Sequence, residues 1–341
     1  MESLVLKNTK YPLSIAPMMD WTDRHYRYFM RQITKKTLLY TEMVNMGAVL
    51  RGERNRILGF SEIEKPLVLQ LGGDNPELLG ECARIAEEWG YDEVNLNVGC
   101  PSERVQQGNF GACLMATPGL VADCVNSMQE KVKIPITVKN RIGINGKESY
   151  EDLAEFVNIV SEAGCKKFIV HSRIAILQGL SPKENRTVPP LRYQDVYQLK
   201  KDFPDIIIEI NGGIKWLEEA KEHLKLVDGV MIGRSAYENP YLFAGVDNLF
   251  FAEKTEISSR REIIENMISY IDKSLKENTP MNYILVHMLG LFNNKNGSKI
   301  WKRFISENMH KKNRGTEILS EVIGLLPDEV LDEIPSISYE I

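Results

Sequence analysis

Short apolar runs alternate with amphipathic helical patterns along most of the chain. Eight of these runs have the length and the residue types of buried strands, and each pair is separated by enough residues for a helix. The predicted strands span residues 13–16, 38–43, 67–71, 93–97, 134–140, 167–171, 206–210 and 229–232.

Two of the intervening helices have clear ends. Asn75 suits the N-cap of a helix, Pro76 suits its first position, and Gly90 suits its end. The pattern over residues 152–164 also ends at a glycine. Strands and helices therefore alternate in a regular order.

Eight alternating strand–helix units predict an α/β fold, a closed (β/α)₈ TIM barrel, over residues 1–245. A doubly wound open sheet is the alternative, but its glycine-rich turn should follow the first strand. Here the glycines follow the last two strands. After Tyr241 the pattern changes, and residues 259–277, 281–292 and 298–309 are helical. We therefore predict a C-terminal helical domain over residues 255–341, joined by a polar linker.

Composition narrows the class of protein. The 341 residues are 43% hydrophobic and carry a net charge of −5, so any nucleic-acid surface must be local. The five cysteines form no C-x-x-C pair, which argues against a disulfide framework or a zinc site and favours a cytoplasmic protein without metal. No apolar run is long enough for a signal peptide or a membrane span.

Polar residues stand at nearly every strand end. Catalytic residues of a TIM barrel lie at the C-terminal ends of its strands, so these positions are candidates as a group. In chain order they are Pro17-Met18, Glu42, Gln70, Asn97 with Cys100, Lys139 with Arg141, His171 with Arg173, Asn211-Gly212-Gly213, and Gly233-Arg234.

The late glycines suit a phosphate site. Glycine lets backbone N–H groups approach phosphate oxygens, and Arg234 can add a bidentate contact, although two ordinary tight turns would have the same sequence. With Lys139 and His171 facing the mouth, a phosphorylated cofactor with an electron-rich ring is expected. Lys139 would offset the negative charge of a reduced flavin, and Gln70 could contact its amide edge.

The motifs at these positions resemble one family. They are APMMDWTDRHYR (16–27), YTEM (40–43), QLGG (70–73), NLNVGCPSERVQQGNFGACLM (95–115), VKNRIG (138–143), VHSRIAILQGLSPKENR (170–186), NGGI (211–214) and GVMIGRSAYENPY (229–241). The chain resembles the tRNA-dihydrouridine synthases, most closely the DusA subfamily. The resemblance implies FMN-dependent reduction of uridine to 5,6-dihydrouridine in the D-loop of tRNA, at positions 20 and 20a, with NADPH as reductant.

The resemblance also implies roles for individual residues. Cys100 would donate a proton to the base. The residues implied to hold FMN are Pro17, Met18, Gln70, Lys139, His171, Asn211, Gly212, Gly213, Gly233 and Arg234.

The chemistry of the reaction gives Cys100 a use. Reducing a C5=C6 bond needs a hydride on one carbon and a proton on the other, and an ordinary thiol, with a pKa of ~8.5, is mostly protonated at neutral pH. Gly99 and Pro101 would fix the loop, and Asn97 would orient the base. A small buried core residue is the usual alternative for cysteine, but Cys100 stands on a polar turn.

A tRNA base has to be extruded to reach a barrel mouth, which requires a surface that grips the backbone. Residues 293–314 carry seven Lys or Arg and one Glu. At helical spacing, Lys299, Lys302 and Arg303 share one face, and Ile300, Trp301, Phe304 and Ile305 share the other. The pattern indicates a phosphate-binding surface, with a merely solvated face as the alternative. By resemblance, Lys183, Arg186, Lys299 and Lys302 are tRNA-reading positions, and relatives often have Arg at the last two.

Two other functions remain open at this point. A flavin-dependent reductase of a free pyrimidine would share the barrel but would not need the basic helices. A tRNA-binding protein without turnover would not need Cys100, Lys139 and His171. No nicotinamide-binding fingerprint is visible, so NADPH is expected to meet the flavin directly, and no obligate protein partner is evident.

Overall fold

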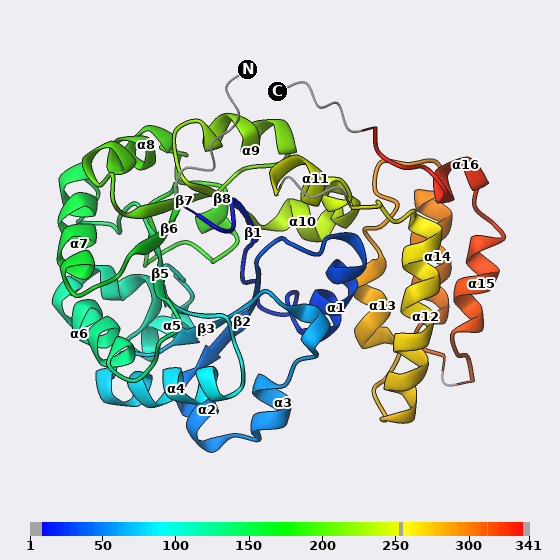
Figure 1. The fold of residues 1–341 in the computed structure, drawn as a ribbon, viewed down its shortest axis with the longest axis horizontal. Helices are drawn as coiled ribbons and strands as arrows, with labels where there is room; N and C mark the ends of the chain where they lie inside the picture. Colours follow the sequence, from blue (N-terminus) through cyan, green and yellow to red (C-terminus); the bar gives the residue numbers. More distant parts are fainter. Residues whose placement is uncertain (1–8, 252–254, 312, 337–341) are drawn as a thin grey trace.

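The computed structural model describes residues 9–251, 255–311 and 313–336. Its main feature is a barrel of eight parallel strands with helices around it (Figure 1). The sheet closes between its first two strands, where Ile15 N–H donates to the Leu38 carbonyl at 3.0 Å and Leu38 N–H donates to the Leu13 carbonyl at 3.2 Å. The strands are β1 (Leu13–Ile15), β2 (Leu39–Asn45), β3 (Leu67–Gly72), β4 (Glu93–Val98), β5 (Ile136–Arg141), β6 (Lys167–His171), β7 (Ile207–Asn211) and β8 (Gly229–Ile232).

Helices fill the connections between the strands, so the predicted (β/α)₈ barrel is confirmed. In chain order they are α1 (Arg24–Ile33), α2 (Met46–Arg51), α3 (Arg54–Leu58), η1 (Glu62–Glu64), α4 (Pro76–Glu88), α5 (Glu103–Gln107), η2 (Gly111–Ala116), α6 (Pro118–Gln129), α7 (Tyr150–Glu162), η3 (Glu184–Arg186), α8 (Tyr193–Asp202), α9 (Leu217–Leu224), α10 (Arg234–Glu238), η4 (Pro240–Phe243) and α11 (Val246–Phe250).

Local sequence sets the helix ends. The Asn75 side chain accepts a hydrogen bond from Leu78 N–H at 2.9 Å, and Pro76 begins α4, as predicted. Gly90 follows α4 with a φ of +87°, a conformation that glycine adopts without steric cost. The predicted strands 167–171 and 229–232 match the observed ones, and the other six differ by one or two residues at one or both ends. The fifth strand begins at Ile136 rather than residue 134, because Pro135 has no N–H to donate to a ladder.

The inside of the barrel is partly apolar and partly polar. A small apolar cluster fills one part of it, made of Ala16, Leu38, Tyr40, Val68, Ile169 and Met231. Buried polar side chains, including Asn95, Thr137 and Glu209, occupy other inward positions. The larger apolar core lies between the strands and the surrounding helices. Polar groups are therefore available along the barrel interior as well as at its mouth.

In the part of the chain that the structure describes, five helices follow the barrel, and Figure 1 shows them grouped beside α1. They are α12 (Arg260–Lys276), α13 (Asn282–Met288), α14 (Ser298–Asn308), α15 (Glu317–Ile323) and α16 (Asp328–Leu331). The three predicted helical segments are confirmed as α12, α13 and α14. Both α12 and α13 pack on α1. The division into domains at residues 245 and 255 stays a prediction, and part of the predicted linker lies outside the described residues.

The apolar side of α14 differs in one position from the prediction. Trp301 and Ile305 are fully buried, and the Trp301 indole donates to the Met288 carbonyl at 3.1 Å. Ile300, predicted on the same face, is 43% exposed. Phe304 is partly buried, so burial decreases from Trp301 and Ile305 towards the edge of the helix on which Ile300 lies. Within the described ranges, no helix combines the length and hydropathy that a membrane span needs.

Candidate active site

The C-terminal ends of the strands bring most of the predicted site residues to one rim of the barrel. Strand pairing places Asn97 beside Lys139 and His171 beside Asn211. Lys139 Nζ donates to Asn211 Oδ1 at 3.2 Å, although β6 separates β5 from β7. This contact requires both side chains to point into the barrel, so these residues surround its mouth.

The loop after β4 holds Cys100 by its backbone. Asn97 Oδ1 accepts hydrogen bonds from the N–H groups of Gly99 at 3.2 Å and Cys100 at 3.0 Å. The Cys100 carbonyl accepts a hydrogen bond from Ala112 N–H at 2.9 Å. Gly111 has a φ of +79°, and a Cβ there would lie 2.6 Å from the Cys100 carbonyl oxygen. Only glycine permits this approach, so the loop is held from two sides while the Cys100 side chain remains partly exposed.

Arg141 joins the Cys100 loop to the loop after β6, a role that the sequence pattern did not reveal. Its side chain is buried, and its Nε donates to the Gly99 carbonyl at 2.9 Å. Its Nη1 donates to the carbonyls of Ile174 and Asn185, both at 3.0 Å. Burial lowers the pKa of Arg141 to about 10, which leaves the side chain charged at neutral pH. The available signal was the position of Arg141 at the C-terminal end of β5, directly after Lys139 and Asn140.

The loop between β6 and α8 folds around Asn185. This buried side chain donates to the Ile176 carbonyl at 2.9 Å and accepts from Ile176 N–H at 2.8 Å. Lys183 and Arg186, two of the predicted tRNA-binding residues, are exposed on this loop. Arg234 Nη2 approaches the Arg186 carbonyl at 3.5 Å, so Arg186 lies next to the predicted phosphate site.

Lys139 and His171 carry an electrostatic cost that an anion would relieve. Burial and, to a smaller extent, nearby Arg141 lower the pKa of Lys139 to about 8. Burial and the neighbouring cations, Arg141 first, lower the pKa of His171 well below its ordinary value. His171 Nδ1 is buried and has no hydrogen-bond partner within the described residues. A polar or anionic ligand at this side of the mouth would therefore find donors ready.

Glycines shape the backbone at the ends of β7 and β8. Gly212 and Gly213 have φ values of +114° and +78°, and a Cβ on Gly212 would lie 3.3 Å from His171 Nε2. The space beside Gly233 is bordered by Met18, whose Sδ lies 3.9 Å from the position of a Cβ on that glycine. This donor set could hold a planar ring between Gln70, Lys139 and His171 with a phosphate near these glycines and Arg234. Pro17 precedes Met18 on the same loop.

The other cysteines differ from Cys100 in their surroundings. Burial raises the pKa of each of the Cys82, Cys124 and Cys165 thiols to about 12, and all three side chains are buried. Cys113 is partly exposed, but its thiol donates to the Phe110 carbonyl at 3.1 Å, and burial raises its pKa. Among the described residues, no cluster of three or more His, Cys, Asp or Glu side chains could hold a metal ion.

The predicted tRNA-binding residues of the C-terminal region lie on α14, apart from the strand-end residues. Lys299 and Lys302 are exposed, and Arg303 is exposed with Glu307 3.9 Å away. The positive charge of residues 293–314 is partly neutralised from outside that segment. Lys295 pairs with Glu333 at 2.6 Å, and Arg314 pairs with the two glutamates of α15. The charge counted along the sequence is therefore higher than the charge presented at this surface.

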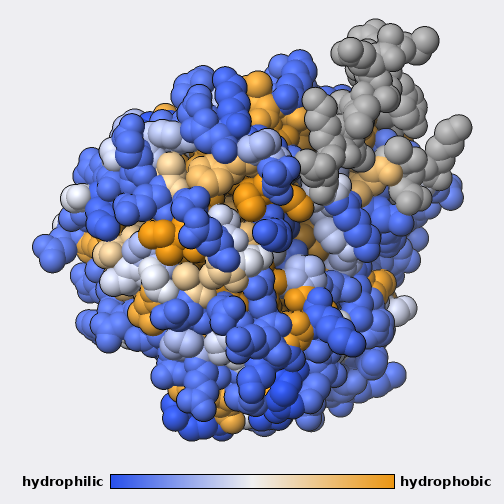
Figure 2. Space-filling model, turned by 60° about the vertical axis from the view of Figure 1, so that its left-hand side comes forward, coloured by the Kyte–Doolittle hydropathy of each residue, from blue (hydrophilic) through white to orange (hydrophobic). Residues whose placement is uncertain are grey.

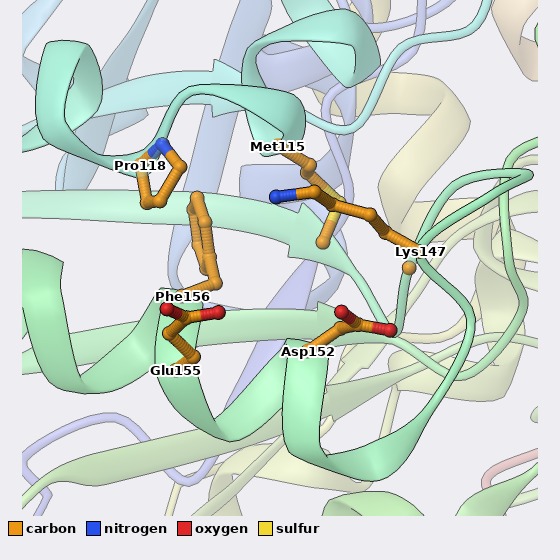
Figure 3. A pocket seen from close by; sticks show the side chains of 7 residues that line it. Met115, Pro118, Lys147, Asp152, Glu155 and Phe156 are labelled. Carbon is orange, nitrogen blue, oxygen red and sulfur yellow. The ribbon is translucent and has the colours of Figure 1, made fainter.

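Two depressions elsewhere contain none of the predicted site residues. The one in Figure 3 lies between the η2–α6 connection and α7, next to Lys147 and Phe156, and measures about 10 Å³. A wider one of about 550 Å³ lies at the N-terminal ends of the strands, lined by residues that include Lys10, Pro66 and Asp92. The face shown in Figure 2 is mostly hydrophilic, with hydrophobic side chains in small separate patches. The polar and charged candidate side chains are therefore concentrated at the strand-end rim, which is the candidate active site.

Comparisons with known proteins identify the family of the chain. The family model described as dihydrouridine synthase (Dus) matches residues 14–325. A protein of Synechocystis sp. named tRNA-dihydrouridine(20/20a) synthase is 60% identical over 92% of this chain and 93% of its own length. A protein of Vibrio vulnificus with the same name is 57% identical over 93% of this chain and 98% of its own length.

One solved structure supports the fold alone. A 2-naphthoyl-CoA reductase bound to 2-naphthoyl-CoA superimposes with a TM-score of 0.54 at 12% identity, over 69% of this chain and 49% of that one. The family model and the curated relatives cover nearly the whole barrel and most of the C-terminal helices. The chain therefore belongs to the dihydrouridine synthase family.

Proposed function

We propose that the chain reduces uridine to 5,6-dihydrouridine in the D-loop of tRNA, at positions 20 and 20a, with FMN as its flavin and NADPH as its reductant, in the cytoplasm. The observation that carries the proposal is Cys100, held by its backbone at the same barrel rim as Lys139 and His171. Relatives that are 57% to 60% identical and named tRNA-dihydrouridine(20/20a) synthase support the substrate and the positions.

The unpaired groups at the rim suit FMN. Lys139 and His171 would contact the electron-rich part of the ring, and the orphaned His171 Nδ1 supports a ligand at this place. Gln70 would contact the amide edge of the ring. The glycines after β7 and β8 and Arg234 would hold the phosphate, with the Pro17–Met18 loop against the ring or its linker.

The reaction adds one hydride and one proton across the C5=C6 bond of uracil. Reduced FMN, when bound, supplies the hydride to one of the two carbons. Cys100 donates its thiol proton to the other carbon, so that the S–H bond breaks as a C–H bond forms, and solvent then reprotonates the thiolate. Asn97 holds the Cys100 backbone through its side-chain oxygen, which limits the thiol to one side of the mouth. Lys139 stabilises negative charge on the opposite side.

The substrate base has to leave its stack to enter the barrel mouth. Lys183 and Arg186 are exposed on the loop that Arg141 and Asn185 hold beside the mouth, where they would contact nearby phosphates. Lys299, Lys302 and Arg303 on α14 would contact the tRNA backbone further away. Binding of the tRNA backbone by these side chains would distinguish the chain from a reductase of a free pyrimidine.

Dihydrouridine mapping of tRNA from cells that lack this protein tests the proposal. We expect uridine in place of dihydrouridine at positions 20 and 20a, with the modification restored by the wild-type gene. Unchanged dihydrouridine at both positions would overturn the proposal. If the purified protein reduces free pyrimidines but not tRNA, the chain is a small-molecule reductase, and tRNA binding without any turnover would make it a binding protein.

A further inference from the structure

We propose that Thr137 and Asn95, two buried residues inside the barrel, position Cys100 through a column of hydrogen bonds that ends on the Cys100 loop. Thr137 is 2% exposed and Asn95 is fully buried, so neither side chain is accessible to a tRNA bound at the protein surface. The inference rests on the proposed function and adds two positioning residues to it. The hydrogen bonds themselves belong to the chain and can be tested without any turnover.

The column runs along β4 with one member each from β3 and β5. Glu93, Asn95 and Asn97 alternate along β4, so their side chains point to the same face of the sheet, into the barrel. Thr137 Oγ1 lies 2.7 Å from Glu93 Oε1 and accepts from Asn95 Nδ2 at 2.9 Å. Asn95 Oδ1 accepts from Gln70 Nε2 at 2.8 Å, and Gln70 Oε1 accepts from Asn97 Nδ2 at 2.9 Å.

The two ends of the column require the same direction for every hydrogen bond. At the mouth, the backbone N–H groups of Gly99 and Cys100 can only donate, so Asn97 must present its oxygen to them. Each amide further from the mouth then has to point its oxygen towards the mouth and its nitrogen towards Glu93. At the other end, the Glu93 carboxylate accepts the hydroxyl proton of Thr137, which leaves the Thr137 oxygen to accept from Asn95. No donor faces a donor anywhere in the column.

The lower end of the column is kept as an acceptor by charge. Lys167 Nζ lies 3.6 Å from Glu93 Oε2 and 3.2 Å from Glu209 Oε2. Burial alone would lower the pKa of Lys167, but the two carboxylates outweigh it and hold that pKa above its ordinary value. The Tyr40 hydroxyl donates to Glu93 at 3.4 Å, and burial raises the pKa of Tyr40 well above its ordinary value. Glu93 is therefore surrounded by donors.

The orientation of Asn97 depends on this column because a side-chain amide can turn over. Turned over, Asn97 would present its nitrogen to two backbone N–H groups, and the Cys100 loop would lose its acceptor. Removing the Thr137 hydroxyl deletes the fixed lower partner of Asn95. The preference of the amides for this orientation then weakens by the free energy of about one hydrogen bond. This corresponds to a factor of roughly 2–10 in the ratio of the two orientations.

The experiment compares amide hydrogen exchange at Gly99 and Cys100 in the wild-type protein and in Thr137→Val, which keeps the side-chain shape without the hydroxyl. We expect exchange at both amides to become about 2- to 10-fold faster in Thr137→Val. Thr137→Ser restores the hydroxyl and is expected to exchange like the wild type. The amides of Val138 in β5 and Val170 in β6 serve as references for the fold. Asn95→Leu breaks the next link and is expected to match Thr137→Val.

The same variants give a second readout in the reaction. Oxidation of the reduced protein by tRNA in a single turnover is expected to slow by a similar factor in Thr137→Val, while its reduction by NADPH stays at the wild-type rate. Unchanged exchange at Gly99 and Cys100 in a folded Thr137→Val or Asn95→Leu protein would overturn the inference. Equal acceleration in Thr137→Ser would also overturn it, because the hydroxyl would then be irrelevant. A wild-type protein that fails to modify tRNA contradicts the proposed function but leaves the exchange result as the test of the column.

Discussion

The two halves of the barrel mouth differ in how far their polar groups are paired. On the β3–β5 side, Gln70, Asn95 and Asn97 form hydrogen bonds with defined donors and acceptors, and the Cys100 loop rests on them. On the β6–β8 side, His171 Nδ1 and Arg173 Nε are buried without a hydrogen-bond partner in the described part of the chain.

The difference separates a side that is organised in advance from a side that requires a ligand. Amides that are already paired hold the proton donor in place and lose little freedom when a substrate arrives. Lys139 stands on β5, but its ammonium reaches Asn211 of β7 and therefore belongs to the second side. Its pKa, which burial lowers to about 8, indicates a cation that is destabilised until an anion neutralises it. Placing the proton donor on the first side and most of the cofactor-binding groups on the second gives each group the environment that its task needs.

Changing Cys100 is expected to have the largest effect, and it acts on the paired half alone. Cys100→Ala should lower the rate of single-turnover flavin oxidation by tRNA about 10²- to 10⁴-fold, the usual contribution of a general acid, and should retain the cofactor. Cys113→Ala is the matched control, because Cys113 is the other partly exposed cysteine and lies in the same connection between β4 and β5. A wild-type oxidation rate in Cys100→Ala would show that the proton comes from elsewhere.

Changing Lys139 tests the cationic half. Lys139→Met should weaken FMN binding about 10- to 100-fold, because a charge-assisted contact is lost, as measured by fluorescence titration of the cofactor-free protein. The same variant should unfold at higher denaturant when no cofactor is bound, with a gain on the order of 1–3 kcal/mol at pH 7, because the buried charge is removed.

The pH dependence fixes the sign of this second effect. Below about pH 8, Lys139 is charged in both the folded and the unfolded protein, and the full penalty is present. As the pH rises from about 8 towards 10.5, the folded state loses its proton first, so the wild-type protein should gain stability relative to Lys139→Met. A constant difference in the free energy of unfolding over this range would contradict the assigned origin of the cost.

The exposed face of α14 has neither the paired amides nor the buried cations of the barrel mouth. The smallest effect is therefore expected there. Replacing Lys299, Lys302 and Arg303 with Gln should flatten the plot of log affinity for tRNA against log salt by roughly two units, at ~0.7–0.9 per phosphate contact. The pairing of Arg303 with Glu307 reduces its share. NADPH oxidation should be unchanged.

A triple Gln variant at Lys215, Lys221 and Lys225 removes the same charge from the region of α9 and serves as the control. Equal loss of salt dependence in the two triple variants would mean that total charge, rather than the α14 face, governs tRNA affinity. Circular dichroism should show both variants folded, because Trp301 and Ile305 still fill the buried side of α14.

The strands and the polar residues at their ends could be predicted because both follow from local pattern. Short apolar runs and glycine at the helix ends are short-range signals, and the strand ends then have to meet at one rim. The roles of Thr137 and Asn95 could not be predicted, since they depend on which residues of β3, β4 and β5 lie side by side. A shift of one residue in that register would turn these side chains to the other face.

Long-range pairing explains the remaining differences. The charge of residues 293–314 is lower at the surface than along the sequence because Glu333 pairs with Lys295 and α15 pairs with Arg314. Arg141 bridges two loops that the sequence separates by more than a strand and a helix. Such contacts are set by the folded arrangement, and no local pattern reports them.

Incubating unmodified tRNA with the purified protein, FMN and NADPH, and then mapping nucleoside masses along the tRNA, tests the central claim most directly. We predict a gain of two hydrogen atoms in the uridines at positions 20 and 20a, and no gain when Cys100→Ala replaces the wild type. Free uracil in parallel reactions should stay unreduced. The account would be contradicted if the protein reduced free uracil but left the tRNA unmodified. It would also be contradicted if Cys100→Ala modified the tRNA as fully as the wild type.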